Sequence, residues 1–170
     1  MGKKIYITEA QMKALTRALI KENVNNDKIE ELLNTVNPYI EECEGNKYQK
    51  DGYISLLFEG NNCSVLLSAE FNFAYSYEGS YRSATYTDPE QYPDLIFEPF
   101  EFYNLELYYL NEEGVETIDE TITLDTNHPL FDECIEILER YENIIQDTLI
   151  EDGTIDSYDD YMDDLRERDY

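Results

Sequence analysis

The sequence predicts an α+β fold in which a four-stranded antiparallel β-meander is packed by two N-terminal helices and one long C-terminal helix. Apolar residues recur at helical spacing before residue 38 and after residue 127. Between these regions the apolar period falls to two, as in half-buried strands. With 170 residues, 42% of them hydrophobic, the chain can build a core. We expect a single domain over residues 1–150, followed by an acidic tail or a short helix over residues 151–170.

Two short helices are predicted in the N-terminal third. Thr8 and Gln11 have the spacing of a capping box, and apolar residues follow on one helical face to about Asn23. Asn26 is expected to cap the second helix, which Pro38 should bend or end. The balanced charge of these helices is typical of a scaffold or a docking surface.

The four predicted strands cover residues 53–58, 65–77, 95–110 and 115–124. The second has the clearest pattern, because apolar and aromatic side chains occupy every odd position from Val65 to Tyr77. Pro99 is expected to disturb the third strand, since proline cannot donate a backbone hydrogen bond. Residues 59–62 and 111–114 are predicted turns.

A long helix is predicted to begin at Asn127-His128-Pro129, because proline is favoured in a first helical turn. Its apolar stripe continues to Leu149. Beyond it, Ser157 with Asp160 has the spacing to cap a short final helix, and a frayed acidic tail is the open alternative.

Charge is distributed very unevenly along the chain. Residues 1–51 hold eight basic and nine acidic side chains, whereas residues 52–170 hold four basic and 30 acidic ones, and the net charge of the whole chain is −27. Such a chain repels nucleic acid and anionic membranes, so we expect neither as a direct ligand. No apolar run approaches the roughly 20 residues that cross a membrane. Together with three widely spaced cysteines, this predicts a cytoplasmic protein with reduced thiols.

Few residues have the pattern of a catalytic site. His128 is the only histidine, so zinc sites with two histidines are excluded, and a structural or surface role is its favoured interpretation. Glycine-rich phosphate loops and nucleophile motifs are absent from the sequence. Acidic pairs are so abundant that each is uninformative. We therefore expect no enzymatic activity, no cofactor and no metal.

The segment Glu78–Pro93 between two predicted strands is unusually long for a loop in a compact domain. Its Tyr81, Arg82 and Tyr86 are candidate partner contacts, although for Arg82 a structural ion pair with Asp88 or Glu90 is the favoured interpretation. The order of Gly79, Arg82, Asp88-Pro89 and Tyr92-Pro93 resembles a loop in small uncharacterised proteins of bacteriophages and mobile elements, over residues 75–97. This resemblance implies a hairpin and a mobile-element setting, and with it a bacterial host cell, and it brings no activity.

The main functional hypothesis is a nucleic-acid mimic that inhibits a basic DNA- or RNA-binding protein, such as a host defence protein. The candidate acidic face consists of two groups of residues. The group on the long helix is Asp132, Glu136 and Glu139, and the group at the last turn and strand is Glu112, Glu113, Glu116 and Glu120. The alternative is an accessory module of a phage or mobile element that docks through the tyrosine-rich loop, the acidity serving only solubility. A homodimer formed through an exposed sheet edge also stays open.

Overall fold

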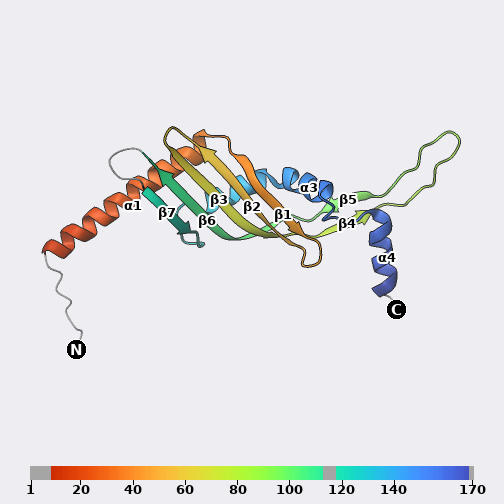
Figure 1. Ribbon diagram of the computed structural model, residues 1–170. Coiled ribbons are helices and arrows are strands. Elements are labelled where there is room, and N and C mark those ends of the chain that lie inside the picture. The colour runs from red at the N-terminus through yellow and green to blue at the C-terminus, as the bar shows by residue number, and fades with distance from the viewer. Residues whose placement is uncertain (1–8, 113–117, 169–170) are drawn as a thin grey trace, which may run out of the picture.

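The computed structural model describes residues 9–112 and 118–168. Its main element is a five-stranded antiparallel sheet in the order β1-β2-β3-β6-β7 (Figure 1). The strands are β1 (Tyr39–Asn46), β2 (Asp51–Glu59), β3 (Cys63–Asn72), β6 (Glu101–Asn111) and β7 (Ile118–Thr123). The predicted α+β class with an antiparallel sheet is therefore confirmed.

A two-stranded arm extends from the sheet between β3 and β6. It consists of β4 (Tyr75–Glu78) and β5 (Asp94–Phe97) and carries the long loop away from the body of the protein (Figure 1). The predicted strand 65–77 is thus interrupted before Tyr75, and the strand 95–110 is interrupted around Pro99. The disturbance expected at Pro99 is confirmed, and it divides one predicted strand into two.

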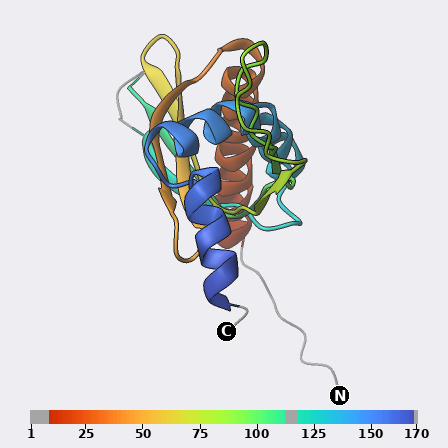
Figure 2. The same ribbon diagram turned by 90° about the vertical axis from the view of Figure 1, so that its right-hand side faces the viewer.

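Helices cover one face of the sheet (Figures 1 and 2). They are α1 (Glu9–Thr35), α2 (Phe131–Arg140) and α3 (Glu142–Glu151), while α4 (Tyr158–Arg168) lies beside the arm. The core fills the space between the sheet and the first three helices. It includes Ile29 of α1, Leu138 of α2, Leu149 of α3 and Leu67 of β3, all fully buried.

The prediction of two N-terminal helices is wrong, since α1 runs without interruption through Asn23–Asn26. Asn25 is buried, and its side-chain amide donates to Glu120 of β7 at 3.2 Å. Asn26, the predicted cap of a second helix, lies inside α1, and its neighbour Asn25 makes a tertiary contact rather than a local cap. Thr8 of the expected capping box lies outside the described residues.

The prediction of one long C-terminal helix is also wrong. The helix is interrupted at Tyr141 (φ −96°, ψ −1°), which is the last boundary residue of α2 and the first of α3. The Tyr141 hydroxyl donates to the carbonyl of Pro38 at 3.1 Å, so the break lets the chain turn along the start of β1. Residues 158–168 form the helix that was one of the two alternatives, and the backbone amide of Asp160 donates to Ser157 Oγ at 3.3 Å.

The sheet has five strands rather than the predicted four, because β1 was not predicted. Its sequence, YIEECEGN, contains three glutamates and reads as polar. None of the described helices is long and apolar enough to cross a membrane.

Candidate functional site: the open face of the sheet

One face of the five-stranded sheet is covered by no described element. Every second residue of a strand faces the helices and is buried, as Ile54, Leu56 and Phe58 are in β2. The strand registers place the other set on the opposite side, which we call the open face. Figure 2 shows α1 and α2 to one side of the strands only.

The open face is strongly acidic. Strand alternation gives it eight carboxylates: Glu42, Glu44, Asp51, Glu59, Glu70, Glu101, Glu106 and Asp119. No lysine or arginine shares these positions in the described strands. Glu42 and Glu44 lie two residues apart on β1, about 6.6 Å from each other. Other pairs, such as Glu44 with Glu70 and Asp51 with Glu101, are two strands apart, about 9.6 Å at a strand spacing of about 4.8 Å. The negative groups are therefore spread over a hydrogen-bonded backbone with uncharged side chains between them.

Tyrosines lie among these carboxylates. A cross-strand row runs from Tyr39 through Leu57 and Leu66 to Tyr108, so part of the face is apolar. A hydrogen bond to Asp119 and burial raise the pKa of Tyr108. The Tyr108 phenol therefore donates to a carboxylate and keeps its proton at neutral pH. The face thus combines negative charge with amphipathic rings.

A β-bulge keeps this pattern intact across β6. The register shifts between Ser68 and Glu70 of β3, and opposite the shift Asn104 adopts φ 51°, in the left-handed region that asparagine tolerates. The side-chain amide of Asn104 donates to Glu70 at 3.1 Å. Because the bulge changes the parity of β6, Tyr103 shares the open face with Glu106 while Leu105 is buried.

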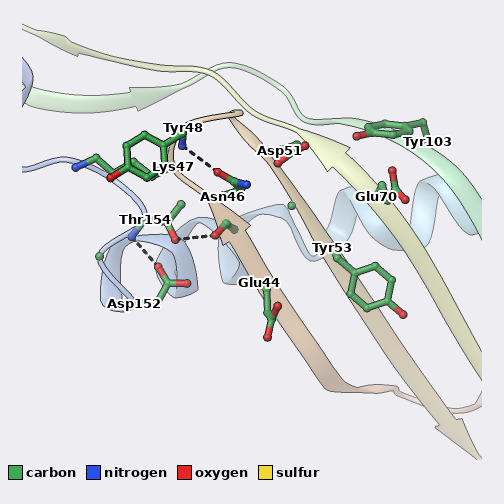
Figure 3. A pocket seen from close by; sticks show the side chains of 13 residues that line it. Glu44, Asn46, Lys47, Tyr48, Asp51, Tyr53, Glu70, Tyr103, Asp152 and Thr154 are labelled. Atoms are coloured by element: carbon green, nitrogen blue, oxygen red, sulfur yellow. Dashed lines mark hydrogen bonds between the residues drawn. The ribbon is translucent and has the colours of Figure 1, made fainter. Parts of the chain in front are cut away.

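A hollow of about 700 Å³ occupies the end of the open face near the β1–β2 turn (Figure 3). Its lining includes the cross-strand row Glu44–Tyr53–Glu70–Tyr103. Burial raises the pKa of Tyr103, and the charges of Glu70 and Asp51 raise it further. The other wall consists of the β1–β2 turn and of Asp152–Thr154 after α3.

A buried polar network joins that wall to the rest of the protein. Asp156 pairs with Lys47 and accepts a hydrogen bond from the Tyr75 hydroxyl at 3.0 Å. The Tyr77 hydroxyl donates to the backbone carbonyl of Asp156 at 2.7 Å. Tyr75 and Tyr77 also contact Tyr161 of α4. The network therefore fixes the α3–α4 linker against the turn and the arm.

The acidic helix residues predicted from the sequence lie in a different place, on the helical side. Asp132, Glu136 and Glu139 line a groove of about 920 Å³ together with Glu30 of α1 and Glu133. Burial and the nearby charge of Glu30 raise the pKa of Glu133. The groove is a second acidic surface, and Arg140 at its edge is a cation that the open face lacks within the described strands.

The predicted acidic residues of the turn and last strand do not line that groove. The Glu120 carboxylate accepts the hydrogen bond from Asn25, and the backbone amide of Glu112 donates to Asn62 at 2.8 Å. Glu113 and Glu116 lie outside the described residues. Sequence reasoning therefore found one acidic surface but missed the open face. Had residues 39–46 been predicted as a strand, strand alternation would have placed Glu42 and Glu44 on the same side as the even positions of residues 64–72, and so revealed this face.

The predicted partner-binding loop continues the arm as an exposed hairpin. Backbone hydrogen bonds of 2.9 Å link Arg82 with Gln91 in both directions, and Thr85 N–H donates to the carbonyl of Asp88 at 2.9 Å. Tyr81 packs against Tyr92 and donates to Glu90. Tyr86 has a relative exposure of 105%, so no described residue covers it.

His128 has a structural contact, as favoured from the sequence. Its Nδ1 accepts a hydrogen bond from the backbone amide of Leu130 at 3.2 Å, just before α2. Cys43 and Cys134 are free thiols, and burial raises the pKa of Cys134 to about 12. In the part of the chain that the structure describes, no three His, Cys, Asp or Glu residues are grouped to hold a metal ion.

Comparison with known proteins returned no relative. No protein-family model, no curated protein and no solved structure matches the chain. The resemblance of residues 75–97 to proteins of mobile elements stays a prediction.

Proposed function

We propose that the protein is a non-enzymatic acidic binding protein that inhibits a nucleic-acid-binding protein by occupying its basic surface. The observation that carries this proposal is the open face, where eight carboxylates stand on one sheet without a lysine or arginine in the described strands. Proteins that bind nucleic acid present lysine and arginine to closely spaced phosphates. Carboxylates about 6.6 Å apart along a strand, as Glu42 and Glu44 are, and about 9.6 Å apart across two strands, as Glu44 and Glu70 are, offer a comparable target.

Rigidity supports this role. Each of the three inner strands is hydrogen-bonded on both sides, and side chains such as Leu67 and Leu107 anchor the opposite face in the core. A preorganised surface loses little conformational entropy on binding. Electrostatic attraction to a basic partner would raise the association rate and weaken steeply with salt.

The test compares two variants of equal net charge. The first neutralises the open face with Glu42→Gln, Glu70→Gln and Glu106→Gln. The second neutralises the helical groove with Asp132→Asn, Glu136→Gln and Glu139→Gln. Wild type and both variants would be immobilised and exposed to a bacterial lysate at 50 mM and 500 mM salt, and the bound proteins would then be challenged with duplex DNA.

We expect the wild type and the groove variant to capture nucleic-acid-binding proteins at low salt and to release them to DNA. The open-face variant should capture little of these nucleic-acid-binding proteins. If only the groove variant loses capture, the partner binds the helical groove rather than the open face. If wild type captures no nucleic-acid-binding protein at 50 mM salt, mimicry is refuted.

A second candidate function is docking through the arm, and the exposure of Tyr86 favours it. A tyrosine at the tip of a projecting hairpin contributes nothing described to the fold, and tyrosines are frequent anchors of protein interfaces. Capture that is lost in Tyr86→Ser, is insensitive to salt, and survives neutralisation of the open face would favour this function.

A further inference from the structure

The hollow at the end of the open face has a more specific chemistry than the rest of that face. Along the row Glu44–Tyr53–Glu70–Tyr103, carboxylates and phenol rings alternate on four neighbouring strands. We propose that this hollow is the anchor site for an arginine side chain presented by the basic partner. The proposal rests on the proposed function and deepens it, because it names the group that the open face recognises.

Charge complementarity selects a cation. Four carboxylates line the hollow, from Glu44, Asp51, Glu70 and Asp152. Lys47 is also part of the lining, but its ammonium is paired with Asp156, which lies outside the lining. The negative charge of the hollow therefore has no neutralising partner among its described lining residues.

The rings select arginine over lysine. Tyr53 and Tyr103 are half-buried, and each stands on a strand next to that of Glu70, about 4.8 Å away. A planar guanidinium can stack on a phenol ring while its N–H groups bind a carboxylate in bidentate fashion. A lysine ammonium is a compact, strongly hydrated charge that cannot do both.

The walls of the hollow are fixed before a ligand arrives. The Asn104 amide holds the Glu70 carboxylate, and Asn46 Oδ1 accepts the backbone amides of Tyr48 and Gln49 at 3.1 and 3.2 Å. The backbone amide of Thr154 donates to Asp152 Oδ1 at 2.8 Å (Figure 3). With about 700 Å³ available, the hollow has space for an arginine and part of the chain that carries it.

The test measures two fluorescein-labelled peptides, hexa-arginine and hexa-lysine, by fluorescence anisotropy at 50 mM salt. We expect the wild type to bind hexa-arginine about threefold to fivefold more tightly than hexa-lysine, as a partly exposed cation–π contact would give. Tyr103→Leu should reduce this ratio toward one, and Tyr103→Phe should keep most of it, because the ring remains. Circular dichroism and thermal melts would show that each variant is folded.

Two variants with the same change in net charge separate the hollow from the general field. Glu70→Gln should weaken hexa-arginine binding more than Glu136→Gln does, because Glu136 lies in the helical groove. Equal affinities for both peptides, or equal effects of these two substitutions, would overturn the arginine site and leave the proposed function standing. Absence of binding to either peptide at 50 mM salt would overturn both.

Discussion

The network around Asp156 provides the sharpest test of how the C-terminal segment is attached. Asp156 is 7% exposed, and its carboxylate receives the Lys47 ammonium and the Tyr75 hydroxyl. Its own backbone amide donates to the Tyr75 hydroxyl at 3.2 Å. Asp156→Asn keeps the shape of the side chain and removes its charge. It therefore isolates the contribution of charge to a contact between the α3–α4 linker, the β1–β2 turn and the arm.

The expected loss follows from these contacts. A hydrogen bond to a charged group contributes about 1.5–3 kcal/mol, and a neutral one about 1 kcal/mol. Two bonds are weakened, but the Lys47 side chain is 40% exposed and regains water when its partner is lost. We expect Asp156→Asn to lower the free energy of unfolding by about 2 kcal/mol at pH 7. This corresponds to a fall in Tm of about 4–8 °C for a chain of this size.

The effect should depend on pH in a defined direction. Burial raises the pKa of Asp156, but the bonds from Lys47 and Tyr75 outweigh it, so the pKa is lowered below its ordinary value. A carboxyl with a lowered folded pKa stabilises the fold above its unfolded pKa, which is near 3.9. That contribution is lost as the pH falls through the folded value, so wild type and variant should converge in acid.

Urea unfolding at pH 7 and at a series of values down to pH 3 measures the loss in the free energy of unfolding and its dependence on pH. Tyr77→Phe is the control, because it removes only a neutral bond to the Asp156 carbonyl. It should cost about 1 kcal/mol with little dependence on pH. Equal stabilities of wild type and Asp156→Asn at pH 7, or a difference that persists unchanged at pH 3, would refute the role given to the charge.

Three further outcomes are expected. Gly52→Ala should destabilise the protein by about 2–4 kcal/mol in urea unfolding, because the new Cβ would lie against the Phe71 ring and 2.5 Å from the Glu44 carbonyl oxygen. Glu44→Gln should raise the Tm slightly at low salt and leave it unchanged at 1 M salt, since neutralisation relieves repulsion within the open face; a gain that is independent of salt would contradict this. Tyr86→Ser should leave the Tm unchanged, because the side chain is fully exposed, and a clear fall in calorimetry would show a contact within the fold.

The sequence predicted the β-rich centre well because each strand there has one apolar face. Val65, Leu67, Ala69, Phe71 and Phe73 are all buried, as their alternation indicates. The same rule did not detect β1, because its inward positions include Cys43 and Gly45, which carry little hydrophobic signal. Only its pairing with β2 in the structure identifies β1 as a strand.

Helix ends were the least predictable feature, because contacts distant in the sequence decide them. Asn26 has the local preferences of a cap, yet α1 continues through it, and its neighbour Asn25 bonds to Glu120, 95 residues away. The helical pattern of 131–149 continues through Tyr141, and only its contact with Pro38 marks the break. Asp132, Glu136 and Glu139 line one groove, since helical spacing alone places them on one side of α2.

The composition of the open face bears on the choice between a binding role and solubility. Solubility requires charge, but it does not require that charge to surround half-buried tyrosines and leucines on one rigid surface. An uncovered row such as Tyr39–Leu57–Leu66–Tyr108 is a liability in a protein that needs only to stay dissolved. Carboxylates that merely solubilise would also be replaceable by carboxylates elsewhere. Moving the charge of Glu42, Glu70 and Glu106 to other exposed positions should therefore preserve solubility and abolish binding, a separation that a purely solubilising surface does not allow.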